Sequence, residues 1–237
     1  MIGVLGGMGP LATVDFFRKV VEEAQAGDDE DHVPLLIQSD PRIPRRPEAI
    51  LAGGASPLPA LLAGRDRLVR GGALALAMPC NTAHYWYGAL VQDCPVPFLS
   101  MVEAACDDLA LNNVPRGAVG ILATRATIAA DVYSRPLGER GYELLTPLEA
   151  DLEQRVLPAI AAVKAGREQS AGEFLLPVLD GLEARGAGGV IVACSELPLA
   201  LDPLMARGRL AESSCLDATR SLARACVRFW AGCDTVP

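Results

Sequence analysis

Two stretches of this chain resemble each other, and each contains one cysteine at the same place. Residues 72–84 read GALALAMPCNTAH, and residues 188–199 read GGVIVACSELPL. Both are short apolar runs that stop at a cysteine followed by small polar residues. Residues 2–6 (IGVLG) and 119–123 (VGILA) match as well, because each is an apolar run followed by a turn and a helix-like segment. The pattern predicts two copies of one α/β unit.

The copies also place one thiol in each half. Gly3 and Gly120 are 117 residues apart, and Cys80 and Cys194 are 114 residues apart. A duplicated unit with one thiol per half predicts a site between two lobes, with a thiol on each side. Two acids that face one small substrate can remove a proton from one face and return a proton to the other.

The composition excludes several classes of protein. The chain has 237 residues, 51% apolar and 21% charged, which fits one large or two small packed domains. A net charge of −8 without a basic cluster argues against a nucleic-acid partner or an anionic membrane surface. No apolar run approaches the roughly 18 residues of a membrane helix. The apolar start lacks a cationic lead, so we interpret it as a strand and expect a cytoplasmic protein.

The seven cysteines show no paired framework, and in a reducing compartment they are thiols. Five of them have no polar neighbours that suggest chemistry, and we interpret these five as structural: Cys94, Cys106, Cys215, Cys226 and Cys233.

Apolar runs of four to eight residues alternate with longer amphipathic segments, which is typical of a parallel α/β fold. We therefore expect two pseudo-symmetric α/β lobes with mostly parallel sheets and the active site in the cleft between them. The predicted strands are residues 2–5, 34–38, 73–78, 97–100, 118–123, 142–145 and 189–193. The predicted helices are residues 11–26, 56–70, 127–137, 149–164, 172–185 and 216–230.

The boundary between the lobes is expected near residues 97–102. We assign residues 1–98 and 208–237 to the first lobe and residues 99–207 to the second. The last helix is placed on the first lobe because the lobes would otherwise have unequal numbers of helices. Residues 41–47 (PRIPRRP) contain three prolines, so we expect an exposed loop there rather than a helix or central strand. This loop follows the second strand, at the sheet edge where ligands bind in open α/β sheets.

A glycine-rich turn, Gly6-Gly7-Met8-Gly9-Pro10, follows the first strand and opens a helix. Such a turn presents backbone N–H groups to an anion. It is also a loose match to the dinucleotide-binding fingerprint, but Asp40 comes later than that fingerprint requires. A tight turn without any ligand is the third interpretation.

The first cysteine segment is Cys80-Asn81-Thr82, at the end of a strand and the start of a helix. The helix dipole is expected to lower the thiol pKa from about 8.5 toward neutrality. Asn81 and Thr82 supply an amide and a hydroxyl that can hold a carboxylate. A single cysteine of this kind is most often a buried core residue, but two at matching places favour chemistry.

The second segment, Cys194-Ser195-Glu196, repeats this arrangement. Ser195 can donate a hydrogen bond to a ligand. Glu196 either caps the following helix or orients a neighbouring group. A zinc site made of Cys80, His84 and Cys194 is an alternative, although no fourth ligand is evident.

The cations of the proline-rich loop and one lysine could bind a second carboxylate. Arg42, Arg45 and Arg46 lie in the loop, and Lys164 ends a predicted helix. A guanidinium fork and an ammonium hold a carboxylate well, but each of these side chains can also be solvated, and Lys164 can simply stabilise its helix C-terminus.

These motifs together resemble the aspartate/glutamate racemase family of cofactor-independent amino-acid racemases, and most closely the aspartate racemase branch. The segments that carry the resemblance are GGMGP (6–10), PRIPRR (41–46), PCNTAH (79–84) and CSE (194–196). They span nearly the whole chain. The resemblance implies two pseudo-symmetric lobes, no cofactor, no metal and a homodimer.

The resemblance also implies roles for individual residues. Cys80 and Cys194 would be the two proton donors and acceptors, while Asn81, Thr82 and Ser195 would hold the α-carboxylate. Met8 would line the site, Arg46 and Lys164 would hold the side-chain carboxylate, and Gly9 and Glu196 would support the site. Two positions depart from the family pattern: Ser195 stands where threonine is usual, and Arg45 where an acidic residue is usual. The second departure leaves open whether Arg45 or Arg46 contacts the substrate.

The sequence therefore predicts a racemase that interconverts L- and D-aspartate, or glutamate, by two-cysteine proton transfer at the α-carbon. Two alternatives stay open. One is the related chemistry of maleate isomerases and arylmalonate decarboxylases, in which one cysteine acts as a nucleophile or as the single proton donor. The other is a non-catalytic dicarboxylate-binding protein, whose lining thiols would have no reason to be acidic.

Overall fold

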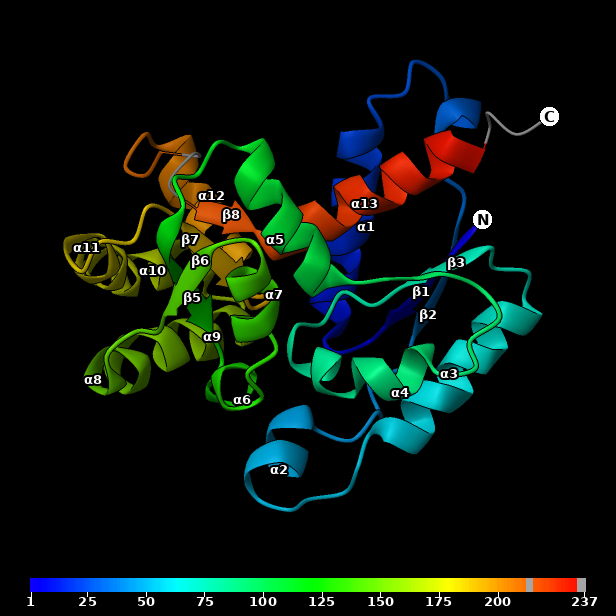
Figure 1. Ribbon diagram of the computed structural model, residues 1–237, viewed down its shortest axis with the longest axis horizontal. Helices are drawn as coiled ribbons and strands as arrows, with labels where there is room; N and C mark the ends of the chain where they lie inside the picture. Colours follow the sequence, from blue (N-terminus) through cyan, green and yellow to red (C-terminus); the bar gives the residue numbers. More distant parts are fainter. Residues whose placement is uncertain (212–214, 234–237) are drawn as a thin grey trace. The chain divides into compact units, whose positions relative to one another are not determined.

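The structure is a computed structural model that describes residues 1–211 and 215–233. The chain forms two compact units (Figure 1). Of the described residues, the first unit contains those up to Ala104 and those from Thr219 to Cys233, and the second contains those between Ala105 and Ala218.

The first unit is built on a parallel four-stranded sheet in the order β2-β1-β3-β4. Its strands are β1 (Ile2–Gly6), β2 (Leu35–Ser39), β3 (Ala75–Ala77) and β4 (Phe98–Leu99). Every residue of β1 and β3 is buried, as expected for central strands covered by helices on both faces.

The second unit has a parallel sheet with the equivalent order, β6-β5-β7-β8. Its strands are β5 (Gly117–Ala123), β6 (Tyr142–Leu145), β7 (Val190–Ala193) and β8 (Cys215–Asp217). The predicted α/β fold with two similar parallel sheets is therefore confirmed.

Strand β8 was not predicted, and residues 208–211 and 215–218, which we assigned to the first lobe, belong to the second unit. Val190 to Val192 of β7 pair with Cys215 to Asp217, so this segment completes the sheet of the second unit. Three residues give too short a period-two pattern to be recognised from sequence. Residues 212–214 and 234–237, which the sequence analysis also placed in the first lobe, lie outside the described residues.

The repeat is visible in packing as well as in topology. A Cβ atom on Gly3 of β1 would lie 3.1 Å from Cβ of Leu68, and one on Gly120 of β5 would lie 3.0 Å from Cδ1 of Leu182. Leu68 lies on α3 (Leu58–Arg70) and Leu182 on α11 (Leu176–Ala184), the helices that precede β3 and β7. In each unit, the absence of a side chain on the strand glycine leaves room for a leucine of the equivalent helix. The repeat in the sequence therefore corresponds to a repeated strand–helix contact in the core.

The helices of the first unit differ from prediction mainly at the proline-rich loop. They are α1 (Pro10–Ala24), α2 (Arg46–Leu51), α3 (Leu58–Arg70), α4 (Tyr87–Val91) and α13 (Ala218–Cys233), with 3₁₀ turns at Asp29–Asp31 and Thr82–Trp86. The expectation of a loop through residue 47 is wrong at its end, because α2 begins at Arg46. Pro47 lies in its first turn, where the missing N–H costs no helical hydrogen bond.

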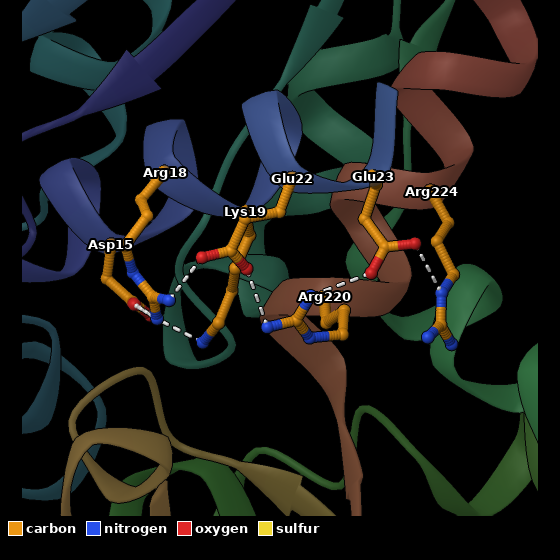
Figure 2. A network of polar contacts seen from close by, with 7 residues as sticks. All are labelled: Asp15, Arg18, Lys19, Glu22, Glu23, Arg220 and Arg224. Carbon is orange, nitrogen blue, oxygen red and sulfur yellow. Dashed lines mark hydrogen bonds and ion pairs between the residues drawn. The ribbon is translucent and has the colours of Figure 1, made fainter. Parts of the chain in front are cut away.

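Helix α13 is bound to α1 by ion pairs (Figure 2). Arg220 reaches Glu23 at 2.8 Å and Glu22 at 2.9 Å, and Arg224 reaches Glu23 at 2.9 Å. Burial raises the pKa of Glu23, but the hydrogen bonds from the two arginines outweigh it and leave the pKa below its usual value. The network fastens the C-terminal helix to the N-terminal one.

The helices of the second unit are more broken than predicted. They are α5 (Met101–Leu111), which begins in the first unit, α6 (Arg125–Ala129), α7 (Ser134–Glu139), α8 (Glu149–Asp151), α9 (Leu157–Lys164), α10 (Glu168–Ala171), α11 (Leu176–Ala184) and α12 (Leu197–Ala206). A π-helical turn joins α8 to α9 at Leu152–Val156, and a 3₁₀ turn precedes α11 at Gly172–Phe174.

The single helix expected at 127–137 is interrupted at Asp131, whose φ is +49°. Helix α5 was not predicted. Among the described residues, no helix has both the length and the apolar character needed to cross a membrane.

Candidate active site

Cys80 lies just beyond β3 in the first unit. The side chain is buried, and the backbone N–H donates to the Met78 carbonyl at 2.8 Å. Asn81 and Thr82 follow it and are also buried. The next element is the 3₁₀ turn Thr82–Trp86 rather than a long α-helix, so the dipole expected to act on this thiol is that of a short element.

His84 is held by backbone groups on both sides of its ring. The Met101 N–H donates to Nε2 at 3.0 Å, so Nδ1 carries the hydrogen that binds the Cys80 carbonyl at 2.9 Å. Burial lowers the pKa of His84 to about 4, and the ring is neutral at pH 7. The proposed zinc site loses its histidine, because neither ring nitrogen is free for a metal. The described residues hold no group of three or more His, Cys, Asp or Glu arranged to bind one.

The glycine-rich turn packs against neighbouring parts of the same chain. Gly7 has φ +91°, and a Cβ there would lie 2.3 Å from the Asp40 backbone nitrogen. The Gly7 N–H donates to Thr13 Oγ1 at 2.9 Å, and this hydroxyl donates to the Gly9 carbonyl at 3.0 Å. The interpretation as a tight turn is therefore favoured over the dinucleotide site. The sequence analysis missed Thr13, although a hydroxyl four residues after Gly9 was the available signal.

Met8 and Arg46 meet beside this turn. Met8 is buried in the apolar cluster that also contains Ile43 and Cys80. The guanidinium of Arg46 donates to the Met8 carbonyl at 3.2 Å and to the carbonyls of Ile43 and Pro44 at 3.3 and 3.2 Å. Its Nε is buried without a partner in the described part of the chain. Carbonyl groups are neutral, so they do not neutralise the positive charge of this half-buried guanidinium. It can therefore still bind an anion.

The other two arginines of the loop already have carboxylate partners. Arg42 pairs with Asp40 at 3.0 Å, and Arg45 pairs with Glu48 at 3.0 Å. Both side chains are well exposed. Of the three loop arginines, Arg46 is therefore the one best suited to a ligand carboxylate.

Cys194 lies just beyond β7 in the second unit, at the position that Cys80 has after β3. Its Sγ donates to Glu196 Oε2 at 3.2 Å, and Ser195 Oγ donates to the same oxygen at 3.3 Å. Glu196 occupies the N-cap position of α12 but makes no side-chain cap hydrogen bond, so the capping interpretation is wrong. Its carboxylate instead accepts hydrogen bonds from the two preceding side chains.

Lys164 approaches the same carboxylate from another element. It ends α9, and its Nζ lies 4.0 Å from Glu196 Oε1. The lysine side chain is 58% exposed, whereas that of Glu196 is 14% exposed. Lys164, Cys194, Ser195 and Glu196 thus form one polar group at the edge of the second sheet.

This environment raises the pKa of the Cys194 thiol well above its usual value. Burial is the largest cause, and the charge of Glu196 adds to it, whereas Lys164 acts in the opposite direction. The acidic thiol expected at the end of such a strand is not found at Cys194, which is a neutral thiol at pH 7.

The structure therefore groups the candidate residues into two sets. The first unit brings together Met8, Arg46 and Cys80, with Asn81 and Thr82 next to the cysteine in sequence. The second unit brings together Lys164, Cys194, Ser195 and Glu196. In the second set, the thiol hydrogen-bonds a carboxylate. In the first set, Cys80 and Met8 share an apolar cluster, and Arg46 binds the Met8 carbonyl.

Comparison with known proteins identifies the family of this chain. The family described as Asp/Glu/Hydantoin racemase matches residues 5–229. The chain belongs to this family. An aspartate racemase of Picrophilus torridus has a similar structure, with a TM-score of 0.81 and 29% identity over 96% of this chain and 93% of that one. The broad specificity amino-acid racemase RacX of Bacillus subtilis is 29% identical over 218 residues, 90% of this chain and 93% of RacX.

A structure from Pyrococcus horikoshii, described as an aspartate racemase homologue, has a TM-score of 0.78 at 24% identity over 97% of this chain and 98% of that one. At this identity the similarity supports the fold alone.

Proposed function

We propose that the protein is a cofactor-independent amino-acid racemase that interconverts the L- and D-enantiomers of aspartate, or of glutamate. The observation that carries the proposal is the equivalent position of Cys80 and Cys194 after the third strands of two sheets with the same order, in a chain of the racemase family.

In this mechanism the two thiols act on opposite faces of one α-carbon. One cysteine, as the thiolate, takes the α-proton and becomes a thiol, and the other gives its proton to the opposite face and becomes a thiolate. The carbanion formed between the two transfers is poorly stable, so its charge must be dispersed by donors aimed at the α-carboxylate. Asn81, Thr82 and Ser195 are the side chains to which we assign this role.

Preference for an acidic side chain is assigned to Arg46 and Lys164. Arg46 has no carboxylate partner in the described part of the chain, which supports its role. Lys164 already faces Glu196, so its contribution requires it to bind the substrate carboxylate in competition with that residue or together with it.

A second candidate is a racemase of broad specificity, as RacX is described. The observation that favours it is the exposed position of Lys164 and its pairing with Glu196. In that case Arg46 alone would favour acidic substrates, and the preference would be weaker.

The proposal includes no cofactor. A pyridoxal enzyme needs a lysine for its Schiff base, and the lysines of this chain are Lys19 and Lys164. Lys19 is buried in an ion pair with Asp15, and Lys164 pairs with Glu196. We expect activity to survive dialysis against a chelator and treatment with hydroxylamine.

The dimer implied by the family resemblance stays a prediction. Helix α1 exposes a row of apolar side chains, Leu11, Val14, Phe17 and Val21, which would suit an interface. Sedimentation would test it. We also expect a reducing compartment such as the cytoplasm, because the two thiols must stay reduced.

The decisive experiment is incubation with L-aspartate and L-glutamate in deuterated water without cofactor. Optical rotation and deuterium at the α-carbon are followed together. Loss of rotation with deuterium uptake is expected. A bound dicarboxylate with no exchange at the α-carbon would instead indicate a binding protein.

A further inference from the structure

The surroundings of Cys194 contain more than a proton-transfer thiol requires. A carboxylate accepts the S–H at 3.2 Å, and the same oxygen accepts the Ser195 hydroxyl at 3.3 Å. An ammonium lies 4.0 Å from the other oxygen of that carboxylate. The three groups form a chain from the exposed Lys164, through the largely buried Glu196, to the buried thiol.

We propose that Glu196 is a positioning residue that holds Cys194 as the protonated thiol, and that Lys164 sets the strength of this hold as the counterion of Glu196. The inference rests on the proposed function, since it assigns Cys194 the role of proton donor in the free enzyme. Cys80 is then the proton acceptor in the first half of a turnover that starts from this state.

The contacts explain why the thiol form is favoured. A carboxylate can only accept hydrogen bonds, so Glu196 binds the S–H but repels a thiolate. When the proton passes to the substrate carbanion, the S–H bond breaks, a C–H bond forms and sulfur keeps the electron pair. The new thiolate then lies beside a carboxylate, which favours the return of a proton in the reverse reaction. The backbone N–H of Glu196 partly offsets this repulsion.

Lys164 acts in the opposite sense. Its positive charge draws the carboxylate and favours the thiolate. Glu196 on the same segment and Lys164 on α9 both act on this sulfur, and the cluster of buried side chains to which Cys194 belongs is apolar. Substitution of the two residues must therefore shift the Cys194 titration in opposite directions.

The test is the pH dependence of Cys194 alkylation by iodoacetamide in the full-length protein, read by mass spectrometry of the cysteine peptides. Below a thiol pKa, the thiolate fraction rises roughly tenfold for each unit by which the pKa falls. The midpoint of the profile reports the titration independently of how accessible the sulfur is. Cys80 in the same sample serves as an internal comparison.

Glu196→Gln is expected to move the Cys194 midpoint to lower pH, because an amide does not repel a thiolate and can donate to it. Lys164→Met is expected to move it to higher pH, and Lys164→Arg to restore the wild-type midpoint. The Lys164→Met shift should shrink at high salt, because Lys164 is exposed. Glu173→Gln removes a carboxylate of the same unit that pairs with Arg209, and it should leave the midpoint unchanged.

The proposal is overturned if Glu196→Gln leaves the midpoint in place or raises it, or if Lys164→Met leaves the midpoint in place or lowers it. Lys164→Met changes an exposed side chain, so this arm decides the question even if Glu196→Gln does not fold. Deuterium exchange of aspartate by the wild type is measured separately. Its absence would refute the proposed function, while the midpoints would still decide how Cys194 is protonated.

Discussion

The two cysteine segments have the same place in the fold and different chemical surroundings. Cys80 lies in an apolar cluster with Met8, and its carbonyl binds a neutral histidine. Cys194 hydrogen-bonds a carboxylate that pairs with a lysine. The duplicated backbone thus fixes where each thiol lies but not its protonation. For a reaction that needs one thiol and one thiolate, unequal surroundings give each cysteine a defined starting role.

The largest effect is expected from removing either thiol. Cys80→Ala and Cys194→Ala should each lower the racemisation rate by roughly 10²- to 10⁴-fold, because a two-base mechanism has no spare base. The measurement is kcat for aspartate in both directions.

Cys215→Ala is the matched control. It removes another buried thiol of the second unit, whose pKa burial raises to about 12, and it should retain activity. Near-native turnover in either Cys80→Ala or Cys194→Ala would show that the two segments are not equivalent in function.

Substitution of the two lysines should change the free energy of unfolding by different amounts. Lys19 lies 2.5 Å from Asp15, and both side chains are almost fully buried (Figure 2). Lys19→Met removes one partner of this pair and should lower the free energy of unfolding by about 3 kcal/mol, the lower end of the range for such losses, because Arg18 still pairs with Asp15.

Lys164→Met should change unfolding by no more than about 0.5 kcal/mol, since its side chain is exposed. Urea unfolding of both variants, together with kcat/KM for aspartate, makes the comparison. If Lys164→Met destabilised the fold as much as Lys19→Met, the Lys164–Glu196 pair would have a structural role.

The sequence predicted the parts of the fold that are long or repeated. The repeat around Cys80 and Cys194 predicted two similar α/β units with mostly parallel sheets. The sequence analysis missed β8 and α5, and it joined α6 to α7. A three-residue edge strand and a break at Asp131 depend on tertiary contacts that local patterns do not record.

For the site, residue types were easier to predict than partners. The sequence analysis selected Cys194, Ser195 and Glu196 as candidates, but the sequence could not show that the Glu196 carboxylate binds the thiol rather than the helix end. The choice among Arg42, Arg45 and Arg46 depended on which of them had a carboxylate nearby. Such contacts are set by how the chain packs.

Acid should destabilise the first unit through His84. Burial lowers its pKa from 6.5 to about 4 in the folded chain, so the unfolded chain binds an extra proton between these values. Stability is retained above pH 6.5 and is lost as the pH falls toward 4, by about 3 kcal/mol at most. Both histidines, His32 and His84, belong to the first unit, so no such histidine effect is expected from the second.

Urea unfolding of the wild type and His84→Gln at several pH values between 4 and 7 isolates this contribution. The variant should be less stable at pH 7, because two buried hydrogen bonds are perturbed, and should lose less stability on acidification. Equal slopes for both proteins would mean that His84 is not held neutral.

The smallest effect concerns the arginines of the first unit. Arg46→Ala should lower kcat/KM for aspartate by roughly 10- to 100-fold, because a charge-assisted hydrogen bond to a shielded carboxylate is lost. Arg45→Ala should change it less than about twofold, since Arg45 is exposed and pairs with Glu48. The measurement is kcat/KM for aspartate and alanine with each variant.

The ratio of aspartate to alanine separates recognition from a structural role. Arg46 also donates to the carbonyls of Met8, Ile43 and Pro44, so Arg46→Ala can perturb the turn and slow both substrates equally. A role in recognition requires the ratio itself to fall, because only aspartate has a second carboxylate to lose. Arg46→Lys keeps the charge but not the fork, and should give an intermediate ratio. If the ratio fell with Arg45→Ala and not with Arg46→Ala, Arg45 would be the contact, and the pairing with Glu48 would have to open when substrate binds.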